Sequence, residues 1–97
     1  MIPRAMTITE IKLSLTTADT TGLTLNVENR AADPSASGND ILSSDLDSGA
    51  GTFTASGTSM SGSYNVITED QFVAVNVTGE GAGEAVGLKV WLLGYWT

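Results

Sequence analysis

The stretch that decides the fold is Glu69–Gly94, which reads EDQFVAVNVTGEGAGEAVGLKVWLLG. In its first run, Phe72–Val77, every second residue is a valine, so the valines share one face. In its second run, Leu88–Leu93, one face is aliphatic and the other carries Lys89 and Trp91. A period of two with β-branched and aromatic residues predicts two β-strands.

The residues upstream predict more strands of the same kind. Alternation places Ile11, Leu13 and Leu15 on one face of a first strand, with Ile8 extending it, and a second strand follows at Leu23–Glu28. Shorter strands are expected at 41–46 (ILSSDL), 52–56 and 64–67, separated by turn-forming residues such as those of 29–40. No stretch shows the 3.6-residue apolar period of a helix.

These patterns predict an all-β protein, a jelly-roll-like antiparallel β-sandwich of about eight strands with no significant helix. The 97 residues suit a single domain. We expect residues 1–5 to form an N-terminal arm. We expect the last strand to end at Gly94, which leaves residues 95–97 as an aromatic C-terminal tail.

The composition narrows the classes of function. The net charge of −7 argues against binding to nucleic acid or to anionic lipid. The absence of cysteine and histidine removes disulfides, thiolate metal sites and the residues from which a catalytic triad is built. No apolar run is long enough to span a membrane, and the first ten residues do not have the pattern of a secretory signal.

Four segments in order resemble a family of small bacteriophage virion β-domains, which includes capsid decoration or cement proteins and modules of head fibres and tail fibres. They are IKLSLTTA (11–18), LTLNVENR (23–30), NDILSSDLDSGAG (39–51) and the C-terminal stretch 69–94, together about 80 residues. The chain departs from the family pattern by an insertion around Ala31–Gly38 and by Tyr95–Trp96 beyond the usual final glycine.

The resemblance implies a jelly-roll-like sandwich without catalysis, often trimeric. We therefore expect a capsid decoration or cement protein that binds the major capsid protein of the assembled shell on the capsid exterior, as a homo-oligomer, a trimer. It would be made in the host cytoplasm, and a free-standing domain of 97 residues favours this role over a fibre module. The alternative is a receptor- or glycan-binding module of a head fibre or tail fibre.

The residues expected to form an interface lie near the two ends of the chain. Trp91, Tyr95 and Trp96 crowd into six positions, and exposed aromatic residues at a terminus often mark a contact surface. Trp91 alone could equally fill the core. The second group is Ile2, Arg4 and Met6 of the arm, where Arg4 could pair with a carboxylate of the shell.

Three other patterns predict no site. The loop 79–87 (GEGAGEAVG) lacks the helix that a dinucleotide motif requires, so we expect a flexible hairpin loop and no cofactor. A carboxylate pair for glycoside hydrolysis has no cleft to fix it, so we expect no catalytic residue. Acidic residues could converge on calcium, but their spacing is poor, so we expect no metal; they are Asp40, Asp45, Asp47, Glu69 and Asp70.

Overall fold

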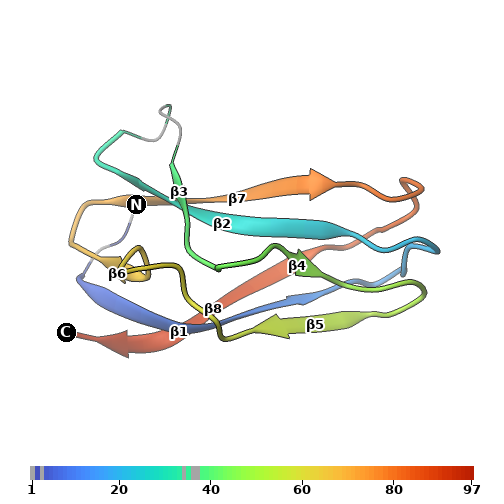
Figure 1. Ribbon diagram of the computed structural model, residues 1–97, viewed down its shortest axis with the longest axis horizontal. Helices are drawn as coiled ribbons and strands as arrows, with labels where there is room; N and C mark the ends of the chain where they lie inside the picture. The colour runs from blue at the N-terminus through green and yellow to red at the C-terminus, as the bar shows by residue number, and fades with distance from the viewer. Residues whose placement is uncertain (1, 3, 34, 36–37) are drawn as a thin grey trace.

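The computed structural model describes residues 2, 4–33, 35 and 38–97, and within them the chain forms two antiparallel β-sheets packed face to face (Figure 1). The all-β sandwich of eight strands is confirmed, and no helix occurs among the described residues. The strands are β1 (Met6–Ser14), β2 (Thr24–Ala31), β3 (Asn39–Asp40), β4 (Leu46–Asp47), β5 (Thr54–Gly57), β6 (Val66–Ile67), β7 (Phe72–Gly79) and β8 (Lys89–Trp96).

The two sheets are built alike. In one, β1 is central, with β8 along one side and the short strands β5 and β6 along the other. In the other, β2 is central, with β7 on one side and the short strands β3 and β4 on the other. The first strand thus pairs with the last and the second with the seventh, the nested pairing of a jelly-roll-like chain path.

The core lies between the two central strands. Its buried side chains come mainly from β1 and β2, and they include Ile8, Ile11 and Leu13 facing Leu25 and Val27. Strict alternation would place Ile8 and Ile11 on opposite faces of β1. A shift of register between Ile8 and Glu10, where β1 pairs with β8, inserts one residue, so both isoleucines point inward.

The predicted strand at 41–46 was wrong. The chain pairs with β2 at β3 and again at β4, and the Ile41 amide still donates to the Val27 carbonyl at 2.8 Å, but residues 42–45 leave that sheet and cross toward the other one. Leu42 forms an isolated bridge with Met60, and the Ser43 amide donates to the Ser59 carbonyl at 2.9 Å. Ile41 and Leu42 are buried by this crossing, which closes one flank of the sandwich.

Asn26 of β2 makes the crossing possible. Its side-chain amide donates to the Leu42 carbonyl and to Asp45 Oδ1, each at 3.1 Å, and its Oδ1 accepts the Leu42 amide at 3.1 Å. The side chain therefore supplies the hydrogen bonds that a continuous strand partner would have made. Asn26 is buried, although it lies between the apolar residues Leu25 and Val27 in the alternating pattern.

The stretch 69–94 does not form a hairpin, as its two strands were expected to do. β7 and β8 belong to different sheets, and the glycine-rich loop crosses between the sheets at one end of the sandwich. The faces of both strands are as predicted: Val90 and Leu92 pack toward the core, while Lys89 and Trp91 are exposed.

The predicted C-terminal tail was also wrong, because β8 continues through Trp96. Tyr95 pairs with Thr7 and Trp96 with Met6, and the Thr97 amide donates to the Ala5 carbonyl at 2.9 Å. Both ends of the chain lie at the same end of the sandwich, and the loops 15–23, 48–53 and 80–88 lie at the other (Figure 1).

The predicted loop 29–40 is shorter than expected, because β2 extends to Ala31 and β3 begins at Asn39. The expected insertion at 31–38 falls partly outside the described residues, at Pro34, Ala36 and Ser37.

Candidate interaction surfaces

An apolar strip runs along the outer face of β8. It consists of Trp91, Leu93 and Tyr95, which we call the aromatic face, and Trp91 and Tyr95 are 47% and 57% exposed. Their partners in β1 are polar residues of the outer face, Lys12 for Trp91 and Thr7 for Tyr95. Because these side chains stand on a paired strand, the surface is fixed in shape before any partner binds.

A shallow depression of about 360 Å³ lies beside Trp91 on the same outer face. Hydroxyl groups and one ammonium group border it. The lining residues are Lys12, Leu13, Ser14, Thr54, Ala55, Ser56 and Trp91. An aromatic ring next to several hydrogen-bonding groups can bind a small polar ligand by stacking and hydrogen bonding.

Trp96 does not belong to the aromatic face. It pairs with Met6, and directly opposed residues of antiparallel strands point to the same face. Met6 is buried in the core, so Trp96 lies on the inner side of the sheet, at its end, where it remains half-exposed. The predicted aromatic trio is therefore divided between two faces of one strand.

The predicted arm residues also take different positions. Met6 is a core residue at the start of β1, and so it does not offer a free contact surface. Ile2 packs partly against the core; its amide donates to the Gln71 carbonyl at 2.8 Å, and its carbonyl accepts the Asp70 amide at 2.8 Å. Of the three, only Arg4 is exposed. Met1 and Pro3 of the arm lie outside the described residues.

The glycine-rich loop binds a carboxylate of the protein itself. Asp19, which is fully buried, accepts the amides of Ala82 and Glu84 at 3.1 and 3.0 Å. It also accepts the amide and hydroxyl of Thr21 and the amide of Gly22. These hydrogen bonds, with those from Glu84 and Thr21 first, hold the pKa of Asp19 well below its usual range. The loop amides thus form an anion-binding nest that is filled by Asp19.

The acidic residues weighed as calcium ligands do not converge. Among the residues that the structure describes, no three acidic side chains lie close enough together to hold a metal ion. Asp45 instead accepts the Thr78 hydroxyl at 2.7 Å. Burial, followed by the charges of Asp45 and Glu28, raises the pKa of Asp40.

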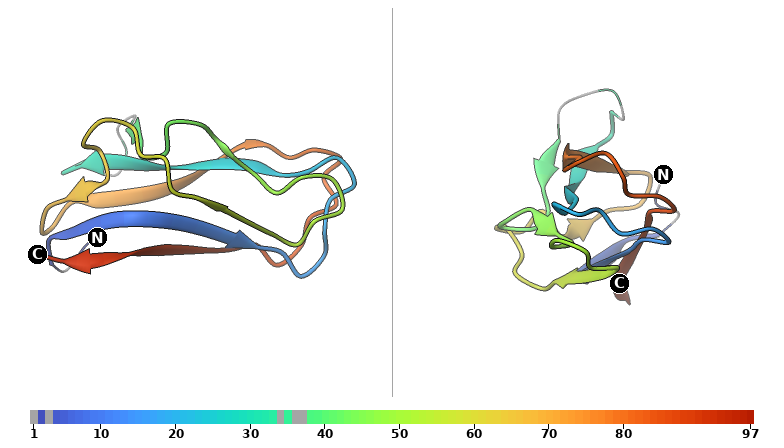
Figure 2. Two further views of the ribbon diagram at one scale, coloured as in Figure 1. Left: turned by 60° about the horizontal axis from the view of Figure 1, so that its bottom comes forward. Right: turned by 90° about the vertical axis from the view of Figure 1, so that its right-hand side faces the viewer.

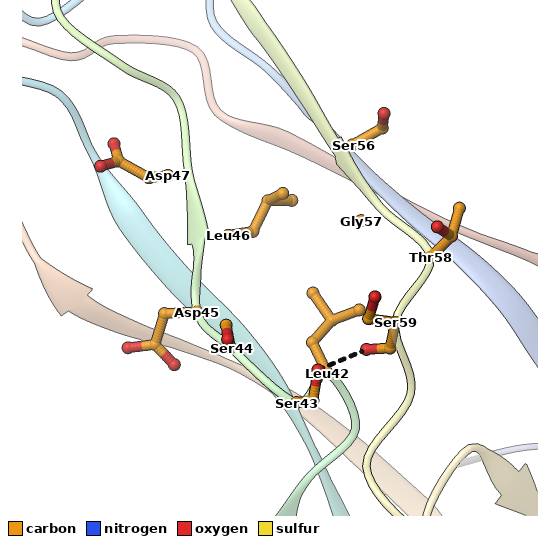
Figure 3. A pocket seen from close by; sticks show the side chains of 10 residues that line it. All are labelled: Leu42, Ser43, Ser44, Asp45, Leu46, Asp47, Ser56, Gly57, Thr58 and Ser59. Atoms are coloured by element: carbon orange, nitrogen blue, oxygen red, sulfur yellow. Dashed lines mark hydrogen bonds between the residues drawn. The ribbon is translucent and has the colours of Figure 1, made fainter.

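Asp45 and Asp47 border a second open depression, of about 440 Å³, where the chain crosses between the sheets (Figure 3). Leu42 and Leu46 point toward Gly57 across it, whereas both carboxylates point away. The Ser43 hydroxyl donates to the Ser59 carbonyl at 3.3 Å at its rim.

Comparisons of the chain with protein-family models, with curated proteins and with solved structures found no match. In the described residues there is no helix with the length and apolar character needed to cross a membrane.

Three buried polar residues hold together segments that lie far apart in the sequence; they are Asp19, Asn26 and Ser48. A local signal existed for Asp19, because Asp-Thr-Thr-Gly is a sequence in which an aspartate bonds the amides that follow it. The Ser48 hydroxyl accepts the Leu23 amide at 2.8 Å, a contact between residues 25 positions apart that no local pattern indicates.

Proposed function

We propose that this chain is a non-enzymatic structural module, a phage capsid decoration or cement protein that binds the outside of the assembled shell as a homo-oligomer and stabilises the major capsid subunits. The observation that supports binding is the aromatic face of β8, where large apolar side chains are exposed on a rigid strand. The virion class rests on the resemblance of the four sequence segments.

The mechanism requires no chemistry. A protein that binds the assembled shell but not the free subunits shifts the equilibrium toward assembly by mass action. An apolar surface that is already ordered loses little conformational entropy on binding, which favours affinity. The aromatic face has this property because β8 pairs with β1 along its whole length.

The test is cosedimentation of the protein with capsids that lack it. We expect saturable binding at a fixed ratio to capsid subunits and a higher temperature of capsid disruption. Trp91→Ala should weaken binding by roughly 10-fold or more, since aromatic residues of this kind carry much of the energy of an interface. Phe53→Ala is the matched control, because Phe53 is also an exposed aromatic residue but precedes β5. Absence of binding to shells would contradict the proposal.

The second candidate is a glycan-binding module of a head fibre or tail fibre. The depression beside Trp91 favours it, because the ring lies next to the hydroxyl-bearing residues Ser14, Thr54 and Ser56. Sugars bind to such sites by stacking on the ring and by hydrogen bonds from hydroxyl groups. Binding to host-cell glycans that is lost in both Trp91→Ala and Thr54→Val, without binding to shells, would select this function.

A further inference from the structure

The two flanks of the sandwich differ. On one flank, backbone hydrogen bonds join the sheets where the chain crosses: Ser43 to Ser59 at 2.9 Å and Ser61 to Ile41 at 2.8 Å. On the other flank lie β7 of one sheet and β8 of the other (Figure 2). Within the described part of the chain, β7 pairs with β2 alone and β8 with β1 alone. We call this second side the open flank.

Apolar side chains that point toward the interior are exposed on the open flank. Val75 and Val77 of β7 lie opposite Val27 and Leu25 of β2, so all four point to the inner face of their sheet. Val27 and Leu25 are fully buried, yet Val75 and Val77 are 47% and 41% exposed. Val75 and Val77 therefore point inward, as core residues do, but they are not covered by the opposite sheet.

β7 is also a sheet edge with little protection. Proteins commonly guard edge strands with charged residues, proline or bulges that prevent pairing with another chain. The eight residues of β7, FVAVNVTG, include no charge and no proline, and the extra residue of the strand, Thr78, lies near its end, where the register with β2 shifts between Val77 and Gly79. Ile2 bonds to Asp70 and Gln71 just before the strand begins, but the part from Val75 onward has no such neighbour among the described residues.

The charge of the flank indicates what kind of partner fits it. The chain carries eleven acidic residues, and none of them lies in β7 or β8. A basic partner would bind where the carboxylates are. A second copy of this chain also carries a charge of −7, so it is repelled least by a flank whose two strands contribute no carboxylate.

We propose that the open flank packs against the same flank of another copy of this chain, with the β7 edge in the contact and Val75 and Val77 buried. The pairing of an exposed edge with a strand of another chain supplies backbone hydrogen bonds, and burial of the valines supplies apolar contact. This inference rests on the homo-oligomer of the proposed function and assigns its contact surface, while the outer, aromatic face of β8 remains available for shell or glycan binding.

The experiment compares two valines of equal exposure. Val75 on the open flank and Val66 on β6 are each 47% exposed, and each is replaced by glutamate. Sedimentation equilibrium of the wild-type chain should give a multiple of the 10.0 kDa monomer. Val75→Glu should raise the dissociation constant by roughly 100-fold or more, and Val66→Glu should leave it within about 3-fold of wild type.

Circular dichroism and urea unfolding establish that each variant is folded. If Val75→Glu does not fold, Val75→Thr keeps the shape of the side chain and should still weaken association by roughly 10-fold. The proposal is overturned if the wild-type chain sediments as a monomer at about 100 µM, if folded Val75 variants associate as wild type does, or if Val66→Glu dissociates the oligomer equally. Cosedimentation with shells reports separately on the proposed function.

Discussion

Asp19 and Glu84 are 65 residues apart in sequence, yet Asp19 Oδ2 accepts the backbone amide of Glu84 at 3.0 Å. Through this contact the first loop between strands is tied to the last one. Since the same carboxylate binds Thr21, Gly22 and Ala82, one buried charge organises the end of the sandwich opposite the chain termini.

Replacement of Asp19 by alanine should loosen that end and destabilise the protein. The variant leaves several amides without an acceptor, and buried amides without partners are unfavourable. Amide hydrogen exchange at Ala82 and Glu84 should accelerate, and the midpoint of urea unfolding should fall. Asp47→Ala is the control, because Asp47 is exposed and its carboxylate accepts the nearby Gly49 amide at 2.8 Å, within its own turn. Equal effects of the two variants would contradict the role assigned to Asp19.

The stability that Asp19 contributes should depend on pH. Its pKa is lower in the folded protein than the ordinary value of 3.8, so the contribution is complete above that value and is lost as the pH falls through the folded pKa. The free energies of unfolding of wild type and Asp19→Asn should therefore differ most near neutral pH. Urea titrations from about pH 7 down to about pH 2 measure this difference in free energy. If the difference stays constant as the pH falls below 3.8, the linkage to Asp19 is refuted.

Asn26→Ala should destabilise the protein by about 3 kcal/mol, because it removes the hydrogen bonds to both backbone groups of Leu42 in a buried site. The variant is measured by urea unfolding. Asn76→Ala provides the comparison, since Asn76 pairs with Asn26 in the β2–β7 register but is exposed, and its cost should stay within about 0.5 kcal/mol. A small effect at Asn26 would mean that the crossing of residues 42–45 is stabilised elsewhere.

Gly94→Ala should cost about 3 kcal/mol or more by the same measurement. Gly94 lies opposite Ile8, beside the shift of register in β1, and an added Cβ would collide with the Thr7 carbonyl. Gly83→Ala is the matched glycine variant: it has open space but a φ of +74°, so only the cost of that conformation, about 1 kcal/mol, is expected. If the two variants lose equal stability, the close approach of Gly94 to the Thr7 carbonyl does not determine the cost of adding a Cβ there.

The sequence predicted those features that depend on neighbouring residues. Alternation assigned the faces of β7 and β8 correctly, because the direction of a side chain in a strand follows from its position alone. It could not predict the shift of register that brings Ile8 and Ile11 to one face, since a bulge depends on the partner strand.

The interface residues show the same limit. Tyr95 was expected at the surface, whereas the sequence left Trp91 open between the core and an interface; both are exposed, and their separation from Trp96 depends on β8 pairing with β1 through its last residues. The exposure of Val75 and Val77 could not be foreseen either, because their alternation is identical to that of a buried row. Only the arrangement of the two sheets leaves that row uncovered.

Both ends of the chain lie at one end of the sandwich. A fusion to either terminus would therefore fix which end of the domain faces the fused partner. Any sequence fused to the N-terminus or the C-terminus would emerge from that end. The three loops at the opposite end would then face away from the point of attachment. The domain could thus serve as an oriented display scaffold, which is attached through its termini at one end and presents its loops at the other.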